Sequence, residues 1–185
     1  MGILRQFVMN EKFDKKQAPA FLIICSTFMI ECINEKIAKI GILRHTNSMS
    51  FDMSDKNINF HENEIDELKS LKETLKLFGG EENLKMYLTG AGGTGKSHVI
   101  HSSQVCCCDF AAKIGLIFNE KTFLITACTG SAAALLNGFT IHSSAHLNRK
   151  KINDEHREYW SDVKILIIDE CSFLSMNDQK ILTRN

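Results

Sequence analysis

Hydrophobic and polar positions in the second half of the chain alternate between short apolar runs and longer amphipathic stretches. The apolar runs at residues 84–88, 122–126 and 163–169 predict strands, and the last has the near-continuous pattern of a strand buried on both faces. Residues 97–114 and the alanine-rich residues 131–136 have the spacing of helices. Strands that alternate with helices of this length predict an α/β fold with a parallel sheet.

The first half has helical patterns only. Residues 16–40 are predicted as a buried helix, because Phe21, Ile24 and Phe28 recur at helical spacing. The apolar part of this segment is shorter than the ~20 residues that cross a bilayer, so we expect no membrane partner. A second helix is predicted over residues 62–78, where Gly79 and Gly80 then end it.

A polar segment rich in asparagine and serine lies between these two helices. This segment, residues 41–61, is predicted to be a mobile loop. The pattern as a whole predicts an N-terminal helical segment over residues 1–83, followed by an α/β domain over residues 84–185.

Composition and charge exclude some classes of protein. The 22 basic and 22 acidic residues cancel, so any site for a polyanion must be local. The seven cysteines include no Cys-x-x-Cys pair, which fits neither a disulfide framework nor a zinc knuckle. Reduced thiols in an intracellular protein are the expected state, with Cys106, Cys107 and Cys108 filling the core. The chain has no clear targeting signal.

A glycine-rich motif carries the strongest chemical signal. Residues 90–97 read GAGGTGKS, which matches G-x-x-x-x-G-K-[ST] between a predicted strand and a predicted helix. Such a loop surrounds phosphates with backbone N–H groups, and the helix that follows adds its positive dipole end. We expect Lys96 to neutralise charge on the β- and γ-phosphates and the Ser97 hydroxyl to bind Mg²⁺. The predicted nucleotide contacts are Gly90, Ala91, Gly92, Gly93, Thr94, Gly95, Lys96 and Ser97.

Two carboxylates follow the last predicted strand. Asp169 and Glu170 come at the carboxyl end of residues 163–169, the edge at which parallel sheets bind ligands. Asp169 is predicted to hold Mg²⁺ through water, and Glu170 to orient and deprotonate the attacking water. Glu170 and Lys96 are the predicted catalytic residues.

Three segments together resemble a known family. The stretches YLTGAGGTGKS, ITACTGSAAALLNGFTIHSS and ILIIDECSF are similar to those of the Pif (petite integration frequency) DNA helicases, including the helicase domain of Helitron transposons. The resemblance implies a 5′-to-3′ ATP-dependent DNA helicase with RecA-like motor domains, acting in DNA repair, recombination or telomere maintenance. It also implies ATP and Mg²⁺ as cofactors, single-stranded and tailed duplex DNA as partners, and a nuclear location.

The second of these three segments, ITACTGSAAALLNGFTIHSS, is absent from generic P-loop ATPases. In the family it lies beside the track of single-stranded DNA. The resemblance therefore implies four residues on the DNA side: Thr129, Gly130, His142 and Ser143.

An N-terminal stretch also resembles the family. The sequence FDKKQAPAFLII is similar to its Leu-Asn-x-x-Gln motif, which reads adenine, and this implies that Gln17 contacts the base. Phe13 and Asp14 stand where the motif has leucine and asparagine.

The resemblance spans about residues 10–182 but only the first part of a motor. The family's glutamine sensor, second motor domain and arginine finger have no counterpart here. We expect an incomplete RecA-like sheet that ends after the strand at 163–169, with residues 84–185 as a partial P-loop helicase motor domain. A second motor domain is expected in a full-length version, and the chain alone is expected not to unwind DNA.

Two other functions stay open at this stage. One alternative is a different DNA-stimulated P-loop ATPase, such as a loader, and the segment at 129–143 argues against it. The other alternative is a truncated transposon or helicase remnant with no enzymatic activity. ATP turnover with and without single-stranded DNA separates these alternatives.

Overall fold

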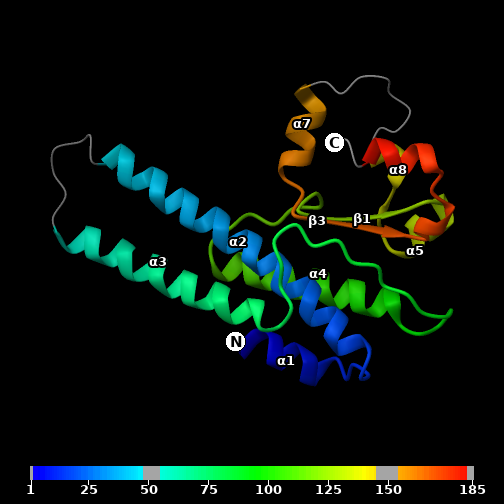
Figure 1. Ribbon diagram of the computed structural model, residues 1–185, viewed down its shortest axis with the longest axis horizontal. Helices are drawn as coiled ribbons and strands as arrows, with labels where there is room; N and C mark the ends of the chain where they lie inside the picture. Colours follow the sequence, from blue (N-terminus) through cyan, green and yellow to red (C-terminus); the bar gives the residue numbers. More distant parts are fainter. Residues whose placement is uncertain (1, 48–54, 145–153, 183–185) are drawn as a thin grey trace. The chain divides into compact units, whose positions relative to one another are not determined.

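The computed structural model describes residues 2–47, 55–144 and 154–182 (Figure 1). The chain divides into two compact units, residues 1–117 and residues 118–185. The boundary predicted between residues 83 and 84 concerns where the motor domain begins, and it stays a prediction.

The first unit is helical. Its helices are α1 (Gly2–Asn10), α2 (Gln17–Asn47), α3 (Asp55–Lys76) and α4 (Lys96–Lys113). Helix α2 packs against both α3 and α4, and α1 packs against α4 and α2 (Figure 1). The helices predicted at 16–40, 62–78 and 97–114 are therefore present, with shifted ends.

Helix α2 forms the centre of this unit. A helix that is apolar around most of its circumference needs neighbours on several sides, and α1, α3 and α4 supply them. The side chains of Phe21, Phe28 and Ile33 are fully buried, as are Leu75 of α3 and Val99 of α4. The apolar run in α2 is thus explained by burial inside the protein.

The predicted loop over residues 41–61 is wrong at both ends. Helix α2 continues to Asn47 and α3 already begins at Asp55, while residues 48–54 lie outside the described residues. A helix that has started extends at little cost per residue, and Leu43 and Arg44 are good helix formers. The high content of asparagine and serine therefore did not mark the ends of the loop correctly.

The strand predicted at residues 84–88 is also wrong. These residues form no strand, and Tyr87 is 72% exposed. A β-strand is stabilised by backbone hydrogen bonds to a neighbouring strand. The described part of residues 1–117 contains no strand, so in this unit the segment has nothing with which to pair.

The second unit has α/β structure. Its elements are β1 (Phe123–Ala127), α5 (Gly130–Leu135), β2 (Phe139–Thr140), α6 (Ile141–Ser144), α7 (Asp154–Ser161), β3 (Ile165–Asp169), the 3₁₀ helix η1 (Cys171–Phe173) and α8 (Met176–Leu182). In the described residues the sheet has the order β2-β1-β3, with both pairings parallel. The predicted α/β class with a parallel sheet is confirmed.

Strand β1 is the central strand and is buried along its whole length. Ile141 of α6 is fully buried and packs against Trp160, Leu166 and Ile168, which joins α6 and α7 to β3. Gly138 allows the chain to pass close to β1, because a Cβ at this position would overlap the backbone oxygen of Ile125. This close approach leads directly into β2.

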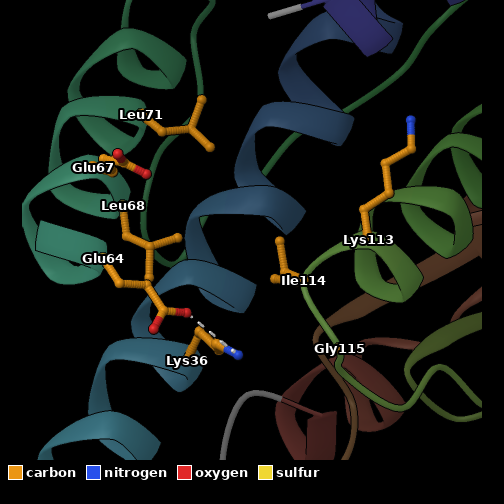
Figure 2. A pocket seen from close by; sticks show the side chains of 8 residues that line it. All are labelled: Lys36, Glu64, Glu67, Leu68, Leu71, Lys113, Ile114 and Gly115. Atoms are coloured by element: carbon orange, nitrogen blue, oxygen red, sulfur yellow. Dashed lines mark ion pairs between the residues drawn. The ribbon is translucent and has the colours of Figure 1, made fainter. Parts of the chain in front are cut away.

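A cavity of about 500 Å³ lies in the first unit, between α2, α3 and the end of α4 (Figure 2). Lys36 of α2 and Glu64 of α3 point toward each other at its edge, with Nζ and Oε1 3.7 Å apart. Leu68, Leu71 and Ile114 supply apolar lining. No residue of the predicted nucleotide site lines this cavity.

Among the described residues, no helix combines the length and the apolar character needed to cross a membrane.

Candidate functional site

The glycine-rich loop forms a tight turn directly before α4. Gly93 and Gly95 both have φ of +76°, a left-handed conformation that side chains other than glycine's rarely adopt. The backbone N–H and the hydroxyl of Thr94 both donate to the carbonyl oxygen of Ala91, at 3.4 and 2.9 Å. Two glycines and one threonine thus give the loop its curvature.

Lys96 is the first residue of α4, and its ammonium group lies against this loop. Nζ donates to the carbonyl oxygens of Gly90, at 2.8 Å, and of Ala91, at 3.1 Å. Its positive charge is therefore held against the backbone of the loop. The phosphate-binding role of the motif stays a prediction.

The N-terminus of α4 adds backbone donors. Its N-cap residue is Gly95, which provides no side-chain cap for the first N–H groups of this 18-residue helix. Such N–H groups, together with the helix dipole, favour an anion. Ser97 follows in the first turn, with its side chain exposed.

Gln17 lies on the same loop, although it is 77 residues away from Thr94 in sequence. Its Nε2 donates to the carbonyl oxygen of Thr94 at 3.1 Å, and its Oε1 accepts from the N–H of Asp14 at 3.0 Å. A Cβ on Gly95 would overlap Gln17 Nε2. The structure thus brings Gln17, the predicted base contact, to the glycine-rich loop, and Gln17 holds the backbone of that loop at Thr94.

Asp14 lies three residues before helix α2 and fixes the position of Gln17, the first residue of that helix. Its Oδ1 accepts from the N–H groups of Lys16 and Gln17, at 2.7 and 2.8 Å. These backbone hydrogen bonds lower the pKa of the Asp14 carboxyl, and the bond from Gln17 has a larger effect than the bond from Lys16. Asparagine, which the family's motif has here, would also supply an oxygen acceptor.

Three further contacts tie the N-terminal segment to α4, and sequence reasoning missed all of them. Glu11 Oε2 accepts from Ser102 Oγ at 3.0 Å and lies 3.5 Å from His98 Nε2. The rings of Phe13 and His98 have centroids 5.2 Å apart. No local pattern signals such contacts, because they join residues more than 80 positions apart.

In the second unit, the predicted carboxylates lie where β3 ends. Asp169 is the last residue of β3, and its Oδ1 accepts from the N–H of Glu170 at 3.0 Å. Glu170 has a φ of +53°, which is unusual for a residue with a side chain. The chain therefore turns sharply at Glu170 and leaves its side chain exposed.

Thr129, predicted on the DNA side, contacts the predicted catalytic glutamate. Its hydroxyl donates to Glu170 Oε2 at 3.1 Å and accepts from the N–H of Ala132 at 3.2 Å. The parallel register pairs Ala127 with Asp169, which sets the two residues side by side. Sequence reasoning named both residues but did not predict this contact.

The other predicted DNA residues lie in two short helices of the same unit, Gly130 in α5 and both His142 and Ser143 in α6. Gly130 is the first residue of α5, and Ser143 Oγ lies 2.9 Å from Thr140 Oγ1. His142 Nε2 lies 3.7 Å from Asp178 Oδ2 of α8. Sequence reasoning did not single out Asp178.

One thiol borders the carboxylates. Burial raises the pKa of Cys128, and the nearby Cys171 and Glu170 raise it further. The N–H of Cys128 donates to the Asp169 carbonyl oxygen at 3.3 Å, so the strand pairing continues one residue past β1. The prediction that three neighbouring cysteines fill the core is wrong for Cys108, which is exposed, whereas Cys106 and Cys107 are buried. Three consecutive residues of a helix point to different sides of it, so one buried face of α4 does not hold all three.

The predicted magnesium ligands have suitable chemistry. A serine hydroxyl and a carboxylate are the hard oxygen donors that Mg²⁺ prefers, and it keeps several waters beside them. Ser97 lies in the first unit and Asp169 in the second. In the part of the chain that the structure describes, no group of three or more His, Cys, Asp or Glu residues is placed to hold a metal.

Comparison with known proteins decides the family. The family model described as AAA domain matches residues 80–185, more than half of the chain. The chain belongs to the AAA domain family. The match includes the glycine-rich loop of this AAA domain, its sheet and both carboxylates, but it leaves out helices α1, α2 and α3.

The chain is also similar to curated DNA helicases. The chain is 27% identical over 156 residues to ATP-dependent DNA helicase PIF1 of Saccharomyces cerevisiae (strain YJM789), and the alignment covers 76% of the chain and 17% of that relative. Over 107 residues it is 35% identical to ATP-dependent DNA helicase PIF7 of Trypanosoma brucei brucei, covering 48% of the chain and 9% of the relative. Over 99 residues it is 30% identical to ATP-dependent DNA helicase PIF1 of Xenopus laevis, covering 48% of the chain and 14% of that relative.

The predicted resemblance to the Pif helicases is confirmed by these relatives. The chain spans less than a fifth of the length of each of them. No solved structure matches the chain significantly.

Proposed function

We propose that this chain is the nucleotide-binding, N-terminal part of an ATP-dependent DNA helicase motor of the Pif type. The observation that carries the proposal is the glycine-rich turn with Lys96 Nζ against the carbonyl oxygens of Gly90 and Ala91. The names of the relatives, all ATP-dependent DNA helicases, supply the reaction and the substrate. The 5′-to-3′ direction is proposed from the same resemblance.

In this proposal the first unit binds the triphosphate. Backbone N–H groups of the loop and of the first turn of α4 donate to phosphate oxygens. Lys96 moves away from the carbonyl oxygens of Gly90 and Ala91 and neutralises the charge of the phosphates. Ser97 and Asp169 would hold Mg²⁺, which supplies positive charge to the phosphates when bound. Gln17 would contact adenine as well as holding the loop.

Glu170 would orient and deprotonate the water that attacks the γ-phosphate. A carboxylate placed after a parallel strand suits this role, because it accepts a proton and is held by a rigid sheet. The exposed side chain and the left-handed backbone of Glu170 support the assignment. They place the carboxylate outside the apolar interior.

The DNA strand would contact the second unit at Thr129, Gly130, His142 and Ser143. These residues carry hydroxyl, imidazole and backbone N–H groups, which bind phosphate oxygens without reading sequence. A second motor domain would be a partner in the full-length protein. Single-stranded and tailed duplex DNA are the proposed substrates, and the nucleus is the proposed location.

ATP hydrolysis by the full-length protein tests the proposal. We expect hydrolysis that rises with oligothymidylate, and a fall of roughly two or more orders of magnitude in Glu170→Gln, which keeps the size of the side chain but loses the base. Glu158→Gln, in α7, is the matched control, since it removes a carboxylate that has no proposed role. Normal hydrolysis by Glu170→Gln would overturn the assignment.

A strand-separation assay beside the hydrolysis assay separates the alternatives. A helicase separates the strands of a 5′-tailed duplex with ATP and Mg²⁺, whereas another DNA-stimulated ATPase hydrolyses ATP without separating them. A protein that neither binds nor hydrolyses ATP would instead be a remnant with no enzymatic activity.

A further inference from the structure

We propose that Cys25 of α2 and Cys106 of α4 are a redox-sensitive pair, which hydrogen peroxide converts into a disulfide that fastens the two helices together. The inference goes beyond the proposed function and does not rest on it, because it concerns the packing of the first unit alone. All seven cysteines are free thiols in the structure, so the reduced pair is the starting state.

Small side chains and thiols are concentrated where α2 packs against α4 (Figure 1). Four thiols without exposed surface lie on these two helices: Cys25, Cys32, Cys106 and Cys107. Ser102, Ser103 and Ala111 of α4 are buried as well. The side chains at a contact set the distance between two helices, so small ones allow a close approach. A disulfide needs such an approach, because its two Cα atoms lie about 4.4–6.8 Å apart.

The thiol of Cys25 is directed toward α4. Its Sγ lies 3.9 Å from the carbonyl oxygen of Ser103, to which it donates a weak hydrogen bond. The same thiol contacts the thiols of Cys106 and Cys107. The contact with Cys25 raises the pKa of Cys106 more than burial does, whereas burial is the largest cause of the raised pKa of Cys107. This difference favours Cys106 over Cys107 as the partner of Cys25.

Hydrogen peroxide is a suitable oxidant for this buried pair, because it is small and uncharged. The Cys106 thiolate attacks one peroxide oxygen, the O–O bond breaks, and a sulfenic acid and one water form. The Cys25 thiolate then attacks the sulfenic sulfur, so that the S–S bond forms and the sulfenic oxygen leaves as a second water. Two thiols and one peroxide thus give one disulfide and two waters. Burial disfavours both thiolates, so the reaction needs sustained exposure to the oxidant.

The two helices that the bond joins also meet at the glycine-rich loop. Gln17, the first residue of α2, donates to the carbonyl oxygen of Thr94, and Lys96 is the first residue of α4. Cys25 and Cys106 lie about two and about three helical turns after these starts. A disulfide between them closes a loop of about 80 residues, which restricts the unfolded chain. The bond would therefore keep α2, and Gln17 with it, on α4.

The first test maps the bond in the 185-residue chain. After prolonged exposure to hydrogen peroxide, the remaining thiols are blocked with N-ethylmaleimide in urea, and the chain is digested with trypsin without reductant. Mass spectrometry should show the peptide with Cys25 joined to the peptide of residues 97–113, and Cys106→Ala should lose this product. The neighbouring substitutions Cys107→Ala and Cys108→Ser are the matched controls and should keep it. No such product in the parent, or its persistence in Cys106→Ala, would overturn the inference.

The second test measures what the bond does, by urea unfolding followed with circular dichroism. Oxidation should lower the unfolding equilibrium constant of the parent by roughly a hundredfold or more, and dithiothreitol should reverse this. Cys107→Ala should respond in the same way, whereas Cys106→Ala should not respond. Each comparison is made within one variant, so a loss of stability from the substitution itself does not affect it. Equal stability of the oxidised and reduced parent would overturn the fastening of α2 to α4.

Discussion

The side-chain amide of Gln17 donates to the carbonyl oxygen of Thr94 at 3.1 Å, and so joins the start of α2 to the glycine-rich loop. The other end of the same amide accepts from the Asp14 N–H at 3.0 Å. Both ends are thus bonded within the first unit. Gln17 therefore holds the backbone of the loop, in addition to the base contact that the family resemblance implies.

Gln17→Glu should weaken binding of ATP and GTP alike, by roughly five- to tenfold. The substitution replaces the donor with an oxygen that repels the Thr94 carbonyl, and one hydrogen bond contributes about 1 kcal/mol. Titrations with fluorescent ATP and GTP analogues measure both affinities. A further loss confined to ATP would measure the adenine contact, and unchanged affinity for both nucleotides would contradict the role in the loop.

Gly138→Ala should destabilise the second unit by about 1–3 kcal/mol, because the added Cβ overlaps the Ile125 carbonyl oxygen of the buried strand β1. Gly130→Ala is the matched control, since a Cβ at Gly130 meets no atom within 4 Å. Chemical unfolding followed by circular dichroism compares the two variants. Equal stability of both would show that β1 and the residues before β2 lie farther apart.

Alkylation should modify Cys108 well before Cys25, Cys106 and Cys107. Cys108 is exposed, whereas the other three thiols are fully buried between α2 and α4. Burial raises the pKa of Cys25 and of Cys107. The pKa of Cys106 is raised mainly by its contact with Cys25 and in addition by burial. Since the thiolate is the reactive form, a time course with iodoacetamide at pH 8, read by mass spectrometry of the peptides, should show an adduct at Cys108 before any at the three buried thiols. Equal rates at all four sites would be inconsistent with this packing.

The same thiols should make the stability of the first unit depend on alkaline pH. The folded state holds the Cys25 and Cys107 protons more tightly than the unfolded chain, in which a thiol ionises near pH ~8.5. The stabilisation is therefore fully present below that pH and is lost as the pH rises above it. Urea unfolding at pH 7.5 and 9.5 should show a smaller loss in Cys25→Ala than in the parent. The opposite order would contradict the burial.

Sequence reasoning found the parts of the site that depend on local pattern. The glycine motif requires a turn at fixed positions, and the apolar run before Asp169 requires a buried strand, so both could be read from neighbouring residues. The apolar residues of α2 likewise predicted a buried helix. In each case the same few residues set both the pattern and the structure.

Other features depend on residues far apart in sequence and could not be predicted. The Gln17–Thr94 and Thr129–Glu170 bonds join positions 77 and 41 residues apart. The apolar alternation at 84–88 resembled a strand, but strand formation depends on a partner that no local pattern reports. The ends of α2 and α3 were misjudged because composition was weighed above helix propagation.

Nucleotide binding by Lys96→Ala tests the central claim most directly. The variant removes the charge that lies against Gly90 and Ala91, and Lys85→Ala is the matched control, because Lys85 is an exposed lysine before the loop. Titration of the chain with a fluorescent ATP analogue and Mg²⁺ should show affinity reduced at least tenfold in Lys96→Ala and unchanged in Lys85→Ala. Equal affinity of the parent and Lys96→Ala would contradict the assignment of residues 90–97 as the phosphate-binding loop.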